Sequence, residues 1–312
     1  MGGSPLSKIM HDAKETTGGA PLDPVTIFLS DPESHLSDIL YIYFRHYKKR
    51  VMHEFMMRAL QEIETSANPL LVADVGSSCA SDLLYIVRRM RKEGQEKMLA
   101  RLNILLLDGD PWSKEAGEPL WADTAKDVRF EFREAYLTEP LPLEPGSVQV
   151  AVCSEVVEHM EEPKLLLQAI YTAMQPGGYL IFTTDNSPSL FQLIRRIPRW
   201  LTGQYAKYYT PRDKDTDIVG TYERKGKTFN IYGHISLKST WEWEKVAREC
   251  GFEIASYGTY ESIRRGGAGS RPVVLAAFFV TGFINSCLPR WLGRYFGDTT
   301  ALLLKKPKRA GA

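Results

Sequence analysis

Leu70-Leu71-Val72-Ala73-Asp74-Val75-Gly76-Ser77-Ser78-Cys79-Ala80 is the stretch of sequence that decides the fold. An apolar run that ends at an acid and a glycine-led turn is typical of a parallel strand that delivers a nucleoside cofactor to the N-terminus of a helix. A second apolar run, 104–107, ends at Asp108, whose carboxylate can accept hydrogen bonds from the two hydroxyls of a ribose. A third run, 148–153, leads into polar residues. The sequence therefore predicts an α/β enzyme that uses a nucleoside cofactor.

The composition favours one catalytic domain with extensions. The chain has 312 residues, 44% of them hydrophobic, so it can bury a full α/β core. Its net charge of +1 gives no global attraction to nucleic acid. The four cysteines lack CxxC spacing, which disfavours a disulfide framework or a structural zinc site and fits a reducing cytoplasm.

Four motifs resemble those of the class I, Rossmann-like S-adenosylmethionine-dependent methyltransferases, over roughly residues 65 to 260. They are the acid and turn at Asp74, the strand-end acid Asp108, the segment Glu155-Val156-Val157-Glu158-His159 after another strand, and the Pro176-Gly177-Gly178 turn before an apolar strand. The resemblance implies methyl transfer from S-adenosylmethionine. It also implies a doubly wound, mostly parallel seven-stranded sheet with helices on both faces.

The resemblance assigns each end of the cofactor to a strand end. Asp74 would accept from the methionine ammonium group, Asp108 would bind the ribose, and Tyr136 would stack on adenine beside the Leu137 backbone. The family often has an acid near the adenine amino group, and in this frame Tyr136-Leu137-Thr138 replaces it. The turn also has serine and alanine where the family pattern has its second and third glycines. The candidate cofactor contacts are Asp74, Gly76, Ser77, Ser78, Cys79, Asp108, Gly109, Asp110, Tyr136, Leu137, Ser154 and Glu155.

Glu155, Glu158 and His159 have an ExxEH spacing, which places the three side chains on one face if the chain turns helical after the strand. This spacing resembles that of ubiquinone-pathway O-methyltransferases and small-RNA 2′-O-methyltransferases, where a later histidine completes a metal site. His234 matches the later histidine. The resemblance thus implies Glu155, Glu158, His159 and His234 as ligands of Mg²⁺ or Mn²⁺, with His159, His234 and Glu158 as catalytic residues. In the alternative without a metal, one histidine is a general base and the glutamates are structural.

The rest of the chain is predicted to form extensions around this domain. Residues 1–24 are expected to be a flexible tail, residues 25–66 an N-terminal helical extension, and residues 67–312 the methyltransferase domain. A basic and aromatic insertion, 185–239, is predicted to be a substrate lid. The apolar and basic element 264–295 is shorter in its apolar part than the ~20 residues of a spanning helix. It indicates a helix at a membrane surface, in the core or at a dimer contact, so the predicted location is the cytoplasm, with peripheral contact at the inner membrane face as an option.

The predicted reaction is O-methylation of a small-molecule, lipid-linked or glycan hydroxyl, because oxygen is the acceptor that the ExxEH resemblance implies. An RNA 2′-hydroxyl is the competing acceptor, and the nearly neutral chain disfavours nucleic acid. A nicotinamide dehydrogenase is disfavoured because the first turn lacks the G-x-G-x-x-G pattern. A degenerate methyltransferase fold that acts as a scaffold is the alternative outside enzymology. The sequence leaves the pathway and the oligomeric state open.

Overall fold

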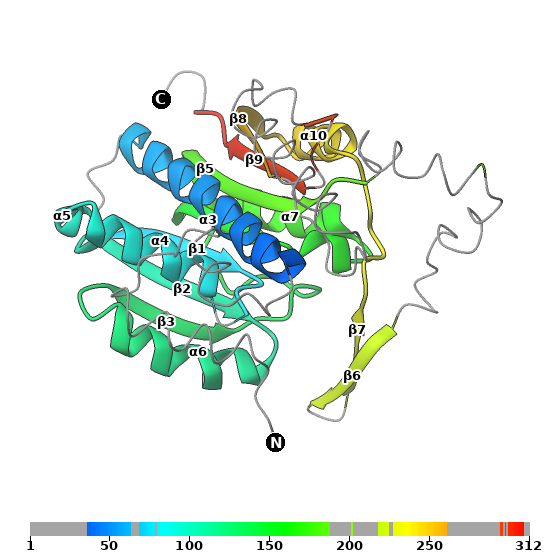
Figure 1. Ribbon diagram of the computed structural model, residues 1–312, viewed down its shortest axis with the longest axis horizontal. Coiled ribbons are helices and arrows are strands. Elements are labelled where there is room, and N and C mark those ends of the chain that lie inside the picture. Colours follow the sequence, from blue (N-terminus) through cyan, green and yellow to red (C-terminus); the bar gives the residue numbers. More distant parts are fainter. Residues whose placement is uncertain are drawn as a thin grey trace.

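The computed structural model describes residues 36–63, 69–78, 80–187, 201, 218–224, 227–260, 294–295, 297 and 299–308 (Figure 1). The predicted tail, 1–24, and nearly all of the predicted C-terminal element, 264–295, lie outside these residues, so both stay predictions. No helix among the described residues is long and apolar enough to cross a bilayer.

A seven-stranded sheet forms the centre of the fold, in the order β3-β2-β1-β4-β5-β9-β8. The five neighbouring strands β3, β2, β1, β4 and β5 are parallel, whereas β9 runs antiparallel to both β5 and β8. The sheet is therefore mostly parallel, as predicted. The strand order reverses between β1 and β4, and such a switch point opens a ligand crevice at the carboxyl ends of the strands. The strands are β1 (Leu70–Val75), β2 (Leu102–Asp108), β3 (Arg129–Glu134), β4 (Val148–Ser154), β5 (Met174–Asp185), β8 (Glu253–Tyr260) and β9 (Thr299–Lys305).

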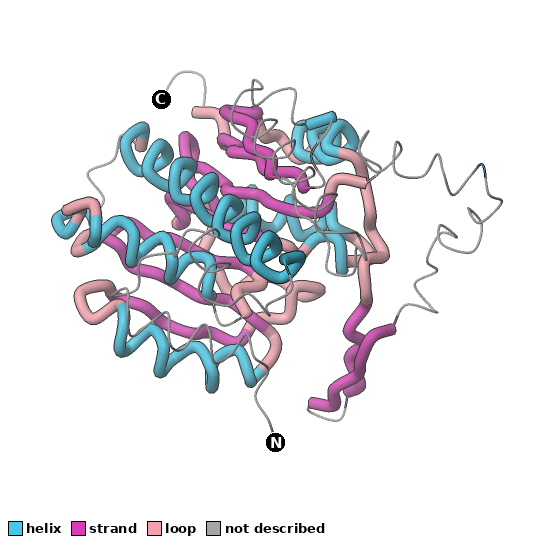
Figure 2. The backbone as a smooth tube through the Cα atoms, in the orientation of Figure 1, coloured by secondary structure: helices cyan, strands magenta, loops and turns pink. Residues whose placement is uncertain are grey.

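Helices cover both faces of the sheet, as Figure 2 shows. Successive strand residues point to opposite faces, so each buried strand contributes to two cores. Val72 belongs to the core beneath α3 (Leu36–Glu62), α4 (Ser81–Lys92) and α6 (Pro111–Thr124), whereas the next residue, Ala73, belongs to the core beneath α7 and α10. Helices α7 and α10 span Pro163–Ala173 and Thr240–Glu249, and the short α5 (Glu96–Leu99) connects α4 to β2.

Helix α3 is part of the sandwich, because it packs directly on the sheet. Its residues Val51 and Phe55 are buried, and they contact β8 at Gly258. A Cβ atom at Gly258 would lie 2.4 Å from Val51 Cγ1, so only glycine lets the helix approach this closely. Helix α3 falls within the predicted N-terminal helical extension, 25–66, which stays a prediction because residues 25–35 and 64–66 lie outside the described residues.

The first turn keeps the backbone of a glycine-rich loop with one glycine. Gly76, Ser78 and Ala80 have φ angles of 76°, 48° and 52°, all in the left-handed region. A side chain in that region costs roughly 1–2 kcal/mol. Ser78 and Ala80 therefore hold a strained conformation at the two places where the family pattern has glycine.

The element boundaries differ from the sequence prediction mainly at β5. The sequence predicts the Pro176-Gly177-Gly178 turn before an apolar strand, but β5 already begins at Met174, and its register against β4 shifts between Val148 and Val150. The strand thus passes through the Pro176-Gly177-Gly178 turn. The predicted lid contains an antiparallel hairpin, β6 (Ile218–Arg224) and β7 (Lys227–Tyr232), which forms a separate two-stranded sheet.

Candidate active site at the carboxyl ends of the strands

Asp108 ties the first turn to the end of β2. Its Oδ2 accepts from the backbone N–H of Ser78 over 2.7 Å, and its Oδ1 accepts from the backbone N–H of Asp110 over 2.8 Å. The N–H groups of Gly76 and Ser77 donate to the carbonyl of Leu107, at 2.9 and 3.0 Å. The strand-end acid that the sequence assigns to the ribose therefore also holds the turn that precedes α4.

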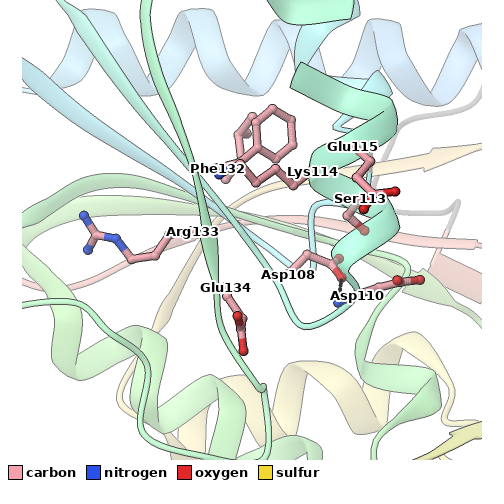
Figure 3. A pocket seen from close by; sticks show the side chains of 9 residues that line it. Asp108, Asp110, Ser113, Lys114, Glu115, Phe132, Arg133 and Glu134 are labelled. Carbon is pink, nitrogen blue, oxygen red and sulfur yellow. Dashed lines mark hydrogen bonds between the residues drawn. The ribbon is translucent and has the colours of Figure 1, made fainter. Parts of the chain in front are cut away.

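A cavity of about 290 Å³ opens beside Asp108. Figure 3 shows Asp108, Asp110 and Glu134 at one end of it, and Ser113 and Lys114 of α6 along its side. Asp108 and Glu134 are register partners on β2 and β3, so their carboxylates lie at the same edge of the sheet. These acids offer acceptors to hydroxyl and amino groups, which is the chemistry of a ribose and an adenine.

Glu134 is a strand-end acid that the sequence prediction does not assign. The predicted adenine position is Tyr136-Leu137-Thr138, and β3 ends two residues before Tyr136, at Glu134. The signal was present, because an acid follows the alternating Phe130 and Phe132 of a strand whose end aligns with that of β2.

The residues after β3 still reach the cofactor turns. Tyr136 packs against Gly109, where a Cβ atom would lie 3.2 Å from the ring. Leu137 and Val156 close over Gly76, and a Cβ there would lie 3.3 Å from Leu137 and 2.5 Å from Val156. The structure thus brings the predicted contacts at Gly76, Gly109, Tyr136 and Leu137 together. Cys79 lies outside the described residues.

Asp74 lies beneath the turn and is almost fully buried. Burial, followed by the charges of Asp82 and Asp108, raises the pKa of its carboxyl group to about 8, against the opposing effect of Lys48. A cationic ligand beside Asp74 would favour the ionised carboxylate. The position therefore suits the ammonium end that the sequence assigns to it.

The predicted metal-binding set does not converge. Within the described part of the chain, no three His, Cys, Asp or Glu side chains could together hold a metal ion. The prediction requires a helix that places Glu155, Glu158 and His159 on one face, but Glu155 has a φ of 57° and only Val157–His159 form a short 3₁₀ helix. A metal centre of Glu155, Glu158, His159 and His234 is thus a prediction that the geometry does not support.

The glutamates of the ExxEH segment instead bind neighbouring hydroxyls. Thr183 Oγ1 donates to Glu155 Oε1 over 3.2 Å, and Thr184 Oγ1 donates to Glu158 Oε2 over 2.8 Å. Glu158 is only 1% exposed, and burial, followed by the charge of Glu155, raises its pKa to about 8. Glu158 therefore lies inside the protein as a weakly acidic carboxyl group.

The two histidines do come together. Their rings are perpendicular, with centroids 4.9 Å apart. His234 Nδ1 lies 2.6 Å from Asp185 Oδ2 at the end of β5, and His159 Nδ1 lies 3.1 Å from the carbonyl of Gly233. An imidazole whose Nδ1–H donates to a carboxylate has its Nε2 available as a proton acceptor.

Three successive residues at the end of β5 thus fix three side chains of the site. Thr183 binds Glu155, Thr184 binds Glu158, and Asp185 binds His234. Strand residues alternate between faces, so side chains from above and below the sheet meet at this end. Asp185 is a second functional candidate that the sequence prediction does not assign, although it ends an apolar strand as Asp108 does.

Comparison with known proteins shows the family to which the chain belongs. Residues 44–257 match a family described as "Methyltransferase domain". The ubiquinone biosynthesis O-methyltransferase of Cupriavidus pinatubonensis is 33% identical over 108 residues, covering 30% of this chain and 42% of the relative. That of Acinetobacter baumannii strain AYE is 27% identical over 186 residues, covering 56% of this chain and 73% of the relative. The chain spans less than half the length of the first of these relatives.

A solved structure extends the likeness of fold. The CurJ carbon methyltransferase has a TM-score of 0.51 and 12% identity, over 97% of this chain and 66% of that one. At this identity the likeness concerns the fold alone.

Proposed function

Because this chain belongs to the class I, Rossmann-like S-adenosylmethionine-dependent methyltransferases, we propose that it methylates a hydroxyl group with His234 as the general base. The observation that carries this proposal is the 2.6 Å contact between His234 Nδ1 and Asp185 Oδ2. The Asp185 side chain is 12% exposed and that of His234 is 40% exposed, so the buried carboxylate can orient an imidazole that an acceptor can reach.

The cofactor residues supply position, and the histidine supplies deprotonation. When bound, S-adenosylmethionine supplies an electrophilic methyl group on a positively charged sulfur. Asp108, Glu134 and the turn at Gly76 would hold its nucleoside and methionine portions at the carboxyl ends of β1 to β3. His234 would accept the hydroxyl proton at Nε2 while the acceptor oxygen attacks the methyl carbon. The bound cofactor would supply the methyl group and keep the electron pair of the carbon–sulfur bond on its sulfur, and the His234 imidazolium would return its proton to solvent.

This mechanism has no step through a metal ion, because the residues predicted as ligands do not fit one. Glu155 and Glu158 accept from threonine hydroxyls, and His234 is oriented by Asp185. His159 packs against the His234 ring and would limit its rotation. The catalytic assignment therefore favours the alternative in which a histidine is the base and Glu158 is structural.

The acceptor that we propose is a small-molecule, lipid-linked or glycan hydroxyl. The relatives named ubiquinone biosynthesis O-methyltransferases support an oxygen acceptor. The net charge of +1 disfavours an RNA substrate. A cytoplasmic location, with or without peripheral contact at a membrane, belongs to the same proposal.

The proposal can be tested with cofactor that carries a labelled methyl group and a panel of phenolic, quinol, glycan and lipid-linked acceptors. For the acceptor that receives the labelled methyl group, His234→Gln should lower kcat by about 10²-fold or more, and Asp185→Asn should lower it less. Both variants should bind S-adenosylhomocysteine with unchanged affinity. Lys245→Gln, at an exposed position of α10, is the matched control and should retain full turnover.

Two results would contradict the proposed mechanism. Full turnover by His234→Gln would remove the base assignment. Loss of turnover in a chelator, restored by Mg²⁺ in the wild type but not in Glu158→Gln, would show that the predicted metal site forms after all.

A further inference from the structure

Five polar side chains close a ring at the carboxyl ends of β4 and β5, and we call it the polar ring. Lys48 Nζ lies 2.9 Å from Asp82 Oδ2 and 3.7 Å from Glu155 Oε1. Ser154 Oγ donates to Asp82 Oδ2 over 3.1 Å, and its contact with Thr183 Oγ1 is 2.9 Å. Thr183 Oγ1 then donates to Glu155 Oε1, which completes the ring. Helices α3 and α4 are thereby joined to the ends of two central strands.

The polar ring contains two carboxylates and the ammonium group of Lys48, and a second ammonium group, that of Lys49, lies 3.5 Å from Asp82 Oδ1. Burial alone would raise the pKa of Asp82, but the ammonium groups of Lys48 and Lys49 lower it to about 2. Lys48 is itself buried. Buried charges that lie this close together must neutralise one another. The ring therefore holds the Glu155 carboxylate in a fixed place, with the ammonium group of Lys48 3.7 Å away.

The polar ring lies between the cofactor turn and the proposed base. Asp82 is in the first turn of α4, directly after the cofactor turn, and Thr183 precedes Asp185 by two residues. Strand β4 lies between β1 and β5 in the sheet. A methyl group that leaves a cofactor on β1 for an acceptor beside β5 must cross the end of β4, where Ser154 and Glu155 lie.

Glu155 is the ring member that a ligand can reach. Its side chain is 34% exposed, whereas those of Asp82 and Lys48 are 17% and 8% exposed. Its left-handed backbone turns the chain at the end of β4. The exposed carboxylate thus lies directly after β4, the strand next to β1, which carries the first turn.

We propose that Glu155, held in place by Lys48 and Thr183, is a specificity-determining residue that favours the cationic methyl donor over its neutral product. S-adenosylmethionine has one more positive charge than S-adenosylhomocysteine, because methyl transfer converts the sulfonium to a thioether. A carboxylate near that sulfur attracts the donor and loses this attraction when the charge disappears. Product release then follows from the chemistry itself. This inference rests on the family's cofactor and not on His234 or the identity of the acceptor.

The test compares two probes in calorimetric titrations of the full chain. One is S-adenosylhomocysteine, and the other is sinefungin, a stable analogue with a protonated amine near the position of the sulfonium. Glu155→Gln should weaken sinefungin binding by about tenfold relative to S-adenosylhomocysteine binding. Thr183→Val keeps the charge but removes a positioning hydrogen bond, and should change the ratio of affinities less. Glu162→Gln, an exposed carboxylate before α7, is the matched control and should leave the ratio unchanged.

The ratio separates a charge effect from damage to the fold. Equal weakening of both probes by Glu155→Gln, or no change in either, would overturn the inference. Failure of the wild type to bind either probe would instead contradict the cofactor assignment that the proposed function shares.

Discussion

The backbone N–H of Ser78 donates to Asp108 Oδ2 over 2.7 Å, so the turn after β1 is fastened to the end of β2. The same carboxylate also accepts from the N–H of Asp110. Two loops that must hold different parts of one ligand are thereby fixed relative to each other. Such preorganisation reduces the ordering that binding would otherwise require.

Asp108→Asn should weaken both the turn and the ligand site. The asparagine amide has one acceptor oxygen, so it cannot accept from Ser78 and Asp110 through both side-chain atoms. We expect the Kd for S-adenosylhomocysteine to rise by about tenfold or more and the midpoint of thermal unfolding to fall by a few degrees. Titration calorimetry and thermal denaturation would measure the two effects. Unchanged affinity would remove Asp108 from the cofactor site.

Ser78→Gly should be neutral or stabilising, unlike an ordinary substitution by glycine. Glycine removes a left-handed strain of about 1 kcal/mol at φ 48°, and this offsets its greater freedom in the unfolded chain. Ala116→Gly, inside α6, is the control and should cost about 1 kcal/mol. Urea denaturation of both variants measures the difference. A loss of stability in Ser78→Gly equal to that of Ala116→Gly would mean that the turn is not strained.

The sequence predicts the strands more reliably than the site. Buried parallel strands are continuous apolar runs, so β1, β2 and β4 are apparent from the sequence alone. The mostly parallel seven-stranded sheet and the first turn follow from the family resemblance. Even the loss of two glycines does not change the turn, because its hydrogen bonds to β2 hold the backbone.

The ExxEH segment shows why the site was harder to predict. Residues three and four positions apart share a face only in a regular helix. Glu155 has a left-handed conformation, so the segment is not a regular helix from that residue on. Lys48 gives no local signal either, because a lysine on an amphipathic helix resembles any solvated charge. Its partner, Asp82, is 34 positions away in the sequence, and only the packing of α3 on α4 brings the two together.

Asp74→Asn should be more stable than the wild type, by a margin that grows as the pH rises, and it should bind the ligand more weakly. The folded-state pKa of about 8 lies above the ordinary value of 3.8, so the folded protein retains a proton that the unfolded chain releases. Stability from this group is therefore present at low pH and is lost as the pH rises from about 4 to about 8. Asparagine cannot ionise, so the melting temperature of the variant should exceed that of the wild type increasingly across this range.

Thermal unfolding of both proteins between pH 5 and pH 8.5 would measure this difference. Asp127→Asn, at an exposed position, is the control and should show no such trend. A constant offset between Asp74→Asn and the wild type would mean that Asp74 is already ionised at low pH. The affinity of Asp74→Asn for S-adenosylhomocysteine should be lower than that of the wild type, because the carboxylate that accepts from the ligand's ammonium group is lost.

Asn186 should be intolerant of a charge, because its fully buried side chain both donates and accepts. Its Nδ2 donates to the carbonyls of Arg294 and Gly297, at 3.1 and 2.6 Å, and its Oδ1 accepts from the N–H of Thr240 over 2.8 Å. Asn186→Asp keeps the acceptor but sets a carboxylate against two carbonyl oxygens. An ionised side chain there has no donor for them, and each unsatisfied carbonyl costs roughly 1–3 kcal/mol. Protonation restores one donor, so the stability of Asn186→Asp should fall as the pH rises.

Asn186→Ala distinguishes this charge effect from the loss of hydrogen bonds. It should be destabilised to a similar extent at every pH, whereas Asn186→Asp should approach or exceed its stability at pH 5 and fall below it at pH 8. Because the residue follows Asp185 directly, hydrogen exchange near His234 and Thr240 should quicken in both variants. Parallel stability curves for the two variants would mean that the carboxylate finds a donor at this site, and the ionic part of the argument would then be wrong.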